Sequence, residues 1–207
     1  LTPSSYDSDG YRNGYVVPCR HLQQVISGLD YAPYVIYVSS TGVYGQQNGE
    51  WVDEDSSCEP ESDSGRMLLQ AEALVRDLPV PSTIIRCSGI YGAGRDFMLR
   101  QLKAGKVTLR ESWTNRIHQD DVARFIAFVI EHPEKRNNLY LLSDDEPVMQ
   151  YEVYQWLARQ LGVEVSSEVE PGPGPRGSKR CNNARVRHSG FTLEYPTYRH
   201  GYAEMIN

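Results

Sequence analysis

VIYVSSTGVYG, residues 35–45, is an apolar run of β-forming residues that ends at two serines, a threonine and a glycine. Residues 34–38 are apolar on both faces of the expected strand, which is typical of a strand inside a parallel sheet covered by helices. The serines would then stand at the carboxyl end of the strand, where doubly wound sheets bind their ligands. An ordinary polar turn at the strand end is the alternative interpretation.

The rest of the chain alternates between helical and strand patterns. Helices are expected over residues 11–28, 64–78, 122–130, 153–161 and 183–188, with short buried strands at 82–87 and 139–142. This alternation predicts an α/β fold with a parallel sheet and crossover helices. The Pro/Gly-rich segment 166–180, SSEVEPGPGPRGSKR, interrupts the rhythm and is expected to be a mobile loop or lid without apolar anchors.

Composition and charge narrow the class of protein. With 207 residues, 40% of them hydrophobic, the chain can bury a sizeable core. The formal net charge of −6 argues against a nucleic-acid partner, and no apolar stretch is long enough for a membrane span. The cysteines are scattered at positions 19, 58, 87 and 181, which fits neither zinc ligation nor a disulfide framework. We expect a cytoplasmic protein without a metal site.

Glycine motifs do not reveal a phosphate-binding loop. Gly172, Gly174 and Gly177 match G-x-G-x-x-G, but proline occupies two of the spacer positions and no helix is expected to follow. Proline has no N–H to offer a phosphate, so we reject this match as a dinucleotide fingerprint. The glycines of GIYGAG, residues 89–94, follow a strand at the wrong spacing and are expected to allow a tight turn.

Three blocks, SSTGVYG, IIRCSGIYGAGR and NRIHQDDVARFI, together resemble the NAD-dependent epimerase/dehydratase branch of the extended short-chain dehydrogenase/reductase superfamily. NNARVRHSGF is similar to the closing helix of that family. The resemblance implies the C-terminal part of a doubly wound, Rossmann-like parallel sheet with a small substrate-binding subdomain. It places residues 1–142 in the Rossmann-like domain, with 95–120 contributing to the substrate side, and residues 143–207 in the subdomain.

The resemblance also assigns site residues. Ser40 would be catalytic, because its hydroxyl would hydrogen-bond the reacting oxygen of the substrate. His118 and Asp120 are expected to cap a helix rather than to take part in catalysis. The remaining assignments are substrate contacts by Thr41, Ser64 and Arg116, and NAD or NADP contacts by Ser39, Cys87, Ser88, Gly89 and Ile90.

Departures from the family pattern concern catalysis directly. Ser64 stands where the family has its tyrosine acid/base, Leu68 replaces the lysine that lowers the pKa of that tyrosine, and Tyr15 replaces an asparagine. Substitute acid/base candidates are Tyr44, Tyr91 and Arg66. The family also has a glycine-rich strand–turn–helix ahead of the helix at 11–28, which these residues do not include. We therefore expect residues 1–207 alone to bind NAD or NADP weakly or not at all.

Three functions are compatible with these sequence features. The leading hypothesis is an atypical NAD(P)-dependent oxidoreductase or epimerase-like protein for a small carbonyl or a nucleotide-sugar-type substrate. The alternative is a non-catalytic protein that senses a dinucleotide or metabolite with the same fold, which loss of the catalytic set favours. A serine hydrolase using Ser40, His118 and Asp120 ranks third, because the chain has no G-x-S-x-G elbow. The expected partners are a small molecule and a second copy in a homodimer.

Overall fold

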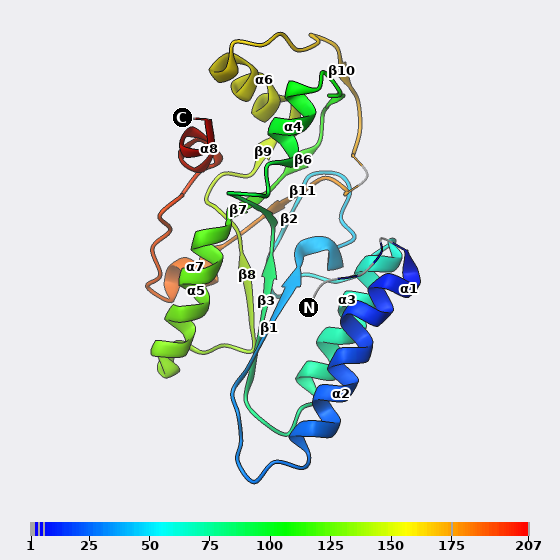
Figure 1. Ribbon diagram of the computed structural model, residues 1–207, viewed down its shortest axis with the longest axis vertical. Coiled ribbons are helices and arrows are strands. Elements are labelled where there is room, and N and C mark those ends of the chain that lie inside the picture. Colours follow the sequence, from blue (N-terminus) through cyan, green and yellow to red (C-terminus); the bar gives the residue numbers. More distant parts are fainter. Residues whose placement is uncertain (1–2, 4, 6, 175, 207) are drawn as a thin grey trace.

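The computed structural model describes residues 3, 5, 7–174 and 176–206 (Figure 1). Its helices are α1 (Ser8–Tyr11), α2 (Val17–Ile26), α3 (Asp63–Arg76), α4 (Phe97–Lys103), α5 (Gln119–Glu131), α6 (Gln150–Leu161), α7 (Ala184–His188) and α8 (Tyr198–Ile206). Its strands are β1 (Val35–Ser40), β2 (Glu50–Val52), β3 (Ser82–Cys87), β4 (Gly89–Tyr91), β5 (Leu109–Arg110), β6 (Trp113–Thr114), β7 (Arg116–His118), β8 (Leu139–Leu142), β9 (Val148–Met149), β10 (Val169–Glu170) and β11 (Lys179–Cys181). None of these described helices is long and apolar enough to cross a bilayer.

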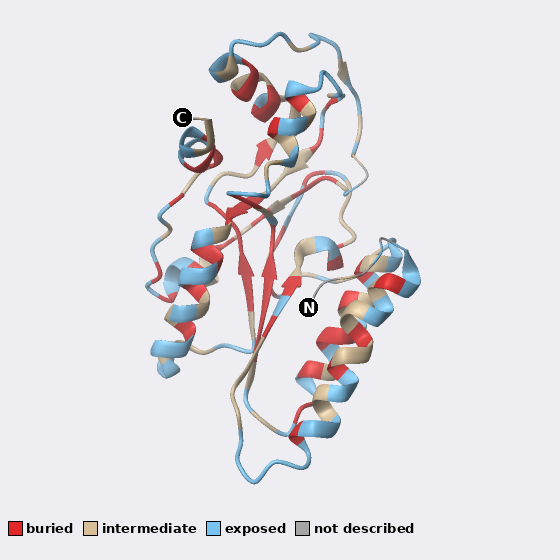
Figure 2. Cartoon of the chain, in the orientation of Figure 1, coloured by how far each residue is buried: buried red, intermediate tan, exposed pale blue. Residues whose placement is uncertain are grey.

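A parallel sheet of order β1-β3-β8 forms the centre of the molecule. Strand β3 lies in the middle, and five of its six residues are buried because helices cover both of its faces. Figure 2 shows β3 and β8 almost wholly buried, whereas β1 carries an exposed stretch around Val38. The parallel α/β fold predicted from the sequence is confirmed.

Helices pack on the two faces of this sheet (Figure 1). On one face, α2 and α3 bury Cys19, Ala71 and Val75 against Tyr37 of β1 and Ile84 of β3. On the other face, α5 and α7 cover a cluster of Ile85, Phe125, Tyr140, Val186 and Phe191. The predicted helix 183–188 is thus confirmed as α7.

A third hydrophobic cluster joins α4, β5, α6 and α8 into a lobe beyond the central sheet. Residues 97–109 share this cluster with residues from 148 onward. The division between the Rossmann-like domain and the subdomain at residue 142 stays a prediction. The lobe contains short strand pairs, β5–β10 and antiparallel β6–β9. These strands have two residues each, so they left no periodic signal in the sequence.

Segment 166–180 is more firmly anchored than the sequence predicted. Val169 packs against the lobe cluster, β10 pairs with β5, and Arg110 forms a 2.7 Å ion pair with Glu170. The expectation of no apolar anchor was therefore wrong. Gly174 and Gly177 form an antiparallel bridge, and strand β11 follows them instead of a helix. This geometry agrees with rejection of the glycine match as a phosphate-binding loop.

Candidate functional site

The serine-bearing ends of β1 and β3 lie side by side at the carboxyl edge of the sheet. In the parallel register, Ser40 is opposite Cys87, so Ser88 follows at the same edge. The backbone N–H of Ser88 donates to the carbonyl oxygen of Leu142 at 3.0 Å, which ties this edge to β8. Because parallel strands joined by a crossover helix end on one side of the sheet, the two predicted site segments come together.

Ser40 ends its strand as a helix cap with part of its hydroxyl still available. The Oγ atom accepts a 3.1 Å hydrogen bond from the backbone N–H of Gly42 and caps the 3-10 turn Thr41–Val43. The side chain is half-buried. A serine hydroxyl has one proton and two lone pairs, so this cap leaves the proton to donate to a ligand. The end of β1 is therefore a polar turn, and its Ser40 hydroxyl can also donate a hydrogen bond to a ligand.

The first turn of α3 packs directly on the turn that follows Ser40. Ser62 caps α3 by accepting a 3.1 Å hydrogen bond from the N–H of Gly65, and its Oγ lies 3.2 Å from that of Ser64. A Cβ at Gly65 would stand 2.5 Å from the carbonyl oxygen of Gly42, so this close approach requires glycine. The contact brings Ser64 beside the Ser40 turn, as the resemblance predicted.

A cavity of about 410 Å³ opens at this place, lined by Asp7, Ser8, Tyr11, Ser62, Asp63 and Ser64. The Ser8 hydroxyl donates to Asp63 at 2.5 Å, which joins α1 to α3. This bond and the neighbouring Arg66 guanidinium lower the pKa of Asp63. Hydrogen bonds from the Gly10 N–H and the Ser5 hydroxyl lower the pKa of Asp7. Both carboxylates are ionised at neutral pH, so the cavity suits a neutral hydroxyl-rich group, such as the sugar end of a larger substrate, better than a phosphate.

A buried ion-pair network links α3 to β1 and β3 near the carboxyl edge of the sheet. Glu72 of α3 accepts from Arg86 of β3 through two hydrogen bonds, Nε–Oε1 at 3.0 Å and Nη2–Oε2 at 2.7 Å. The Ser39 hydroxyl donates to the same carboxylate at 2.7 Å, and Arg86 donates to the Tyr44 hydroxyl at 3.0 Å. Since the Ser39 hydroxyl is buried and bonded to Glu72, only the backbone of this predicted cofactor residue can serve a ligand.

The predicted cofactor segment that follows β3 divides into inward and outward residues. The Cys87 side chain belongs to the apolar cluster under α5, and burial raises the pKa of its thiol to about 12. Its side chain is therefore a core group, and the predicted contact of Cys87 with a cofactor stays a prediction. The Ser88 Oγ is buried without a hydrogen-bond partner among the described residues. Gly89 is exposed and Ile90 half-buried.

Arg116, predicted to face the substrate, is buried with an exposed fraction of 4%. Its Nη2 donates to Thr114 Oγ1 at 2.8 Å, and its guanidinium lies 5.6 Å from the centre of the Tyr198 ring. Asp144 lies close behind, because its N–H donates to the Arg116 carbonyl at 2.7 Å. Burial raises the pKa of Asp144 well above its usual range, although the Arg116 charge opposes this rise. Arg116 is thus an interior residue whose Nη1 has no hydrogen-bond partner among the described residues, and its contact with a substrate stays a prediction.

Each of the three candidate substitutes for the missing tyrosine is either buried or paired with another residue. The buried Tyr44 hydroxyl donates to the Asp53 carbonyl at 2.7 Å, and burial raises its pKa. Burial also raises the pKa of Tyr91, whose hydroxyl is covered by Gly201 of α8, where a Cβ would stand 2.3 Å away. Arg66 pairs with Asp63 and donates to the Glu61 carbonyl. Leu68, in the lysine position, is buried in the core.

His118 caps α5, as predicted, because its Nδ1 accepts from the Asp120 N–H at 3.3 Å. Its ring is packed between those of Tyr91 and Tyr195, with centroid distances of 5.2 and 3.8 Å. These contacts support a structural role, and they weaken the serine-hydrolase hypothesis, which needs a histidine that faces the serine.

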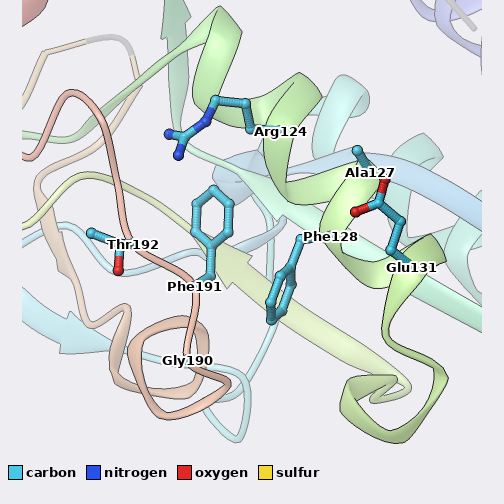
Figure 3. A pocket seen from close by; sticks show the side chains of 7 residues that line it. All are labelled: Arg124, Ala127, Phe128, Glu131, Gly190, Phe191 and Thr192. Atoms are coloured by element: carbon cyan, nitrogen blue, oxygen red, sulfur yellow. The ribbon is translucent and has the colours of Figure 1, made fainter.

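A second cavity of about 380 Å³ lies away from these residues, between α5 and the segment after α7 (Figure 3). Phe128 and Phe191 form its apolar part, and Arg124 lies 5.4 Å from the centre of the Phe191 ring. Arg124 also pairs with Asp121 at 2.6 Å. None of the predicted site residues lines this cavity, and we assign it no part in catalysis.

Sequence reasoning missed Glu72, Arg86 and Tyr11. A sequence signal for the first two was present, because each is a charged residue among apolar ones. Glu72 lies between Leu68 and Val75 of α3, and Arg86 lies within STIIRC. A buried charge at such a position needs a partner. Tyr11 had no comparable signal, because its place in the cavity depends on how α1 packs on α3.

Comparison with known proteins agrees with this geometry. Protein YeeZ of Escherichia coli K12 is 32% identical over 188 residues, which cover 85% of this chain and 65% of YeeZ, so the chain spans less than two thirds of that relative. A Methylobacillus flagellatus protein assigned as an NAD-dependent epimerase/dehydratase has a TM-score of 0.83 and 37% identity, covering 96% of this chain and 72% of its own.

The dTDP-4-dehydrorhamnose reductase of Clostridium acetobutylicum, 18% identical, shares the fold with a TM-score of 0.75 over 96% of this chain and 75% of its own. The family model of the RmlD substrate binding domain matches residues 30–207, most of the chain. This chain therefore belongs to the RmlD substrate binding domain family, within the short-chain dehydrogenase/reductase-like superfamily.

Proposed function

We propose that this chain forms the substrate-side part of an NAD(P)-dependent oxidoreductase or epimerase that acts on a small carbonyl or a nucleotide-sugar-type substrate. The observation that carries the proposal is the shared edge of β1 and β3. There Ser40 keeps a hydroxyl proton to donate, beside the cavity that contains Ser64. A hydroxyl donor of this kind polarises a carbonyl or stabilises an alkoxide.

The described residues fit only the nicotinamide end of the NAD or NADP that the family implies. Ser88, with its buried and unpartnered Oγ, and the exposed Gly89 suit contact with the nicotinamide ring and its carboxamide. Among the described residues, the glycine turn Gly92–Gly94 leads from β4 into α4, but it does not have the G-x-G-x-x-G spacing of a turn that holds a pyrophosphate. When bound, the cofactor would supply or accept the hydride, while the residues of this chain would orient the substrate oxygen.

A non-catalytic metabolite-binding protein is the second candidate. The replacement of tyrosine and lysine by Ser64 and Leu68 favours it, because a serine has no acidity near neutral pH and the leucine is buried in the core. In this alternative the same cavity would bind its ligand without turnover, and Ser40 would contribute affinity alone.

The two candidates differ in turnover. The full-length gene product is incubated with NADH or NADPH and a panel of aldehydes, ketones and keto-sugar nucleotides, and cofactor oxidation is followed by absorbance. We expect turnover with at least one carbonyl, reduced in Ser40→Ala and unchanged in Ser57→Ala, a control serine whose side chain is exposed. Tight binding of a panel member without turnover would favour the metabolite-binding alternative.

Cofactor binding by residues 1–207 alone is a separate measurement. Because the described residues include no loop that would bind the pyrophosphate, titration calorimetry should detect no affinity for NADH or NADPH in the low micromolar range. A low-micromolar dissociation constant would contradict our account of how the cofactor is held.

A further inference from the structure

An arginine lies between two tryptophan rings on the outer face of the β2–β11 strand pair (Figure 1). In the parallel register of this pair, Arg180 of β11 is opposite Trp51 of β2. The guanidinium carbon of Arg180 lies 4.9 Å from the centre of the Trp51 ring and 5.0 Å from that of Trp113 in β6. Val52 and Cys181, the next residues of the two strands, are buried in the core. The Arg180 cluster (Trp51, Trp113 and Arg180) therefore faces away from the core.

The guanidinium of Arg180 is held in place and still has donors to offer. Its Nε donates to the Gly49 carbonyl oxygen at 2.7 Å. A Cβ at Gly49 would stand 2.7 Å from the Trp113 ring, so this packing requires glycine. The two terminal nitrogens of Arg180 have no hydrogen-bond partner among the described residues. A fixed guanidinium fork of this kind matches two oxygens of a phosphate or carboxylate, and little side-chain freedom is lost when the oxyanion binds.

Trp51 adds an open aromatic face to the cluster. Its exposed fraction is 57%, although Arg180 lies over one face of the indole. Tryptophan is highly buried on average, so this exposure is unusual. A flat ring can stack on the uncovered face, and such stacking tolerates any nucleobase because every base has a π face. The cluster thus offers a stacking surface beside a free guanidinium fork.

Asn115 ties the Arg180 cluster to the edge of the sheet where the candidate site lies. The Asn115 side chain donates to the Lys179 carbonyl oxygen at 2.9 Å and accepts from the Cys181 N–H at 2.8 Å. It therefore bonds to the backbone on both sides of Arg180. The Asn115 carbonyl oxygen accepts from the N–H of Gly89, in the segment expected to contact the nicotinamide, at 3.2 Å. The Asn115 segment thus connects the cluster directly to this edge.

We propose that the Arg180 cluster binds a nucleoside diphosphate, the nucleotide part of the substrate, with its base stacked on Trp51 and its phosphate oxygens accepting from the terminal nitrogens of Arg180. The inference rests on the proposed function and narrows its substrate class to a sugar bonded to a nucleotide. Local charge agrees with this assignment. The carboxylate beside Trp51 in the chain, Glu50, accepts from Asn48 rather than from Arg180, so no ion pair competes with a phosphate.

Binding of dTDP to the full-length gene product tests this subsite by titration calorimetry. Saturating NADH is present, so that the cofactor site is occupied. We expect the dissociation constant to rise about tenfold in Arg180→Lys, because lysine lacks the fork, and about tenfold in Trp51→Ala, because the stacking surface is lost. The matched control is Arg20→Gln, which removes an exposed charge on α2 and should leave the dissociation constant unchanged.

Tryptophan fluorescence gives a second readout that does not depend on turnover. A base stacked on Trp51 should quench its emission, so quenching by dTDP should be mostly lost in Trp51→Phe. The exposed position of Trp51 makes this variant unlikely to disturb the core. Trp156→Phe is the control, because Trp156 packs against Tyr198 in the lobe and its replacement should leave the quenching in place.

The outcomes separate this inference from the proposed function. Equal dTDP affinity in wild type, Arg180→Lys and Trp51→Ala, or a wild type that does not bind dTDP, would overturn the subsite. Turnover of an aldehyde or ketone from the panel would in that case leave the proposed function standing. Binding of dTDP that depends on Arg180, in a protein that turns over no carbonyl, would overturn the proposed function and retain the subsite for the metabolite-binding alternative.

Discussion

Replacing Glu72 by glutamine should destabilise the fold far more than an ordinary charge change. The Glu72 side chain is fully buried and that of Arg86 is 4% exposed, and their two hydrogen bonds measure 3.0 and 2.7 Å. In Glu72→Gln, an amide NH₂ would face the donors of Arg86, which would leave a buried guanidinium without a counter-charge. Breaking a buried pair in this way costs about 3–5 kcal/mol. The Ser39 hydroxyl would also lose its charged acceptor.

Urea unfolding followed by circular dichroism measures this cost, provided that the m value stays constant. The matched control is Asp63→Asn, which removes the exposed ion pair with Arg66, whose side chains are 55% and 53% exposed. Exposed pairs contribute about 0–1 kcal/mol, so this control should change stability little.

The paired variant Glu72→Met/Arg86→Met removes both charges and should cost clearly less than the sum of the two single changes. If Glu72→Gln costs no more than Asp63→Asn, or if the paired variant costs the full sum, then the network does not act as a buried ion pair and the reasoning fails.

Further expectations concern single residues and one segment. Ser40→Ala should weaken dTDP-glucose binding by about 1 kcal/mol, near fivefold. It should lower the free energy of unfolding by less than about 1 kcal/mol, since only the hydrogen bond from the Gly42 N–H is lost. Unchanged affinity in calorimetry would contradict a ligand contact by Ser40. In limited digestion with a glutamate-specific protease, the exposed stretch 166–168 should be cut first, and equal hydrogen-exchange protection of this stretch and α5 would contradict that order. Asp144 has a folded-state pKa raised above its ordinary 3.8, so its favourable contribution to stability is complete below that value and is lost as pH rises through the raised pKa. Asp144→Asn should flatten the dependence of the melting temperature on pH, and a profile identical to wild type would refute this.

The long periodic elements could be predicted from the sequence, whereas the short pairings could not. Residues 82–87 and 139–142 form strands with the predicted bounds, because unbroken apolar runs of that length have few alternatives. Segment 46–64 read as a loop, yet it contains β2, which pairs with β11 more than a hundred residues away. A three-residue strand of this kind is stabilised by its distant partner and leaves no local pattern.

The candidate site was predictable in its location but not in its chemistry. Ser40 and Ser88 could be placed at one edge because the connection between parallel strands is right-handed. The burial of Arg116 and the bond between Ser39 and Glu72 depend on which face of the backbone meets a neighbouring element, and no alternation in the sequence records that. Tyr11 enters the cavity through the packing of α1 on α3, which is again a tertiary property.

The most direct test of the central claim is a crystal structure of the full-length gene product with NAD or NADP and a sugar nucleotide such as dTDP-glucose. Our account predicts that the nicotinamide lies against Ser88 and Gly89, and that the reacting sugar oxygen lies within hydrogen-bond distance of the Ser40 Oγ. A sugar bound instead in the cavity between α5 and Phe191, with Ser40 facing only solvent, would contradict the account.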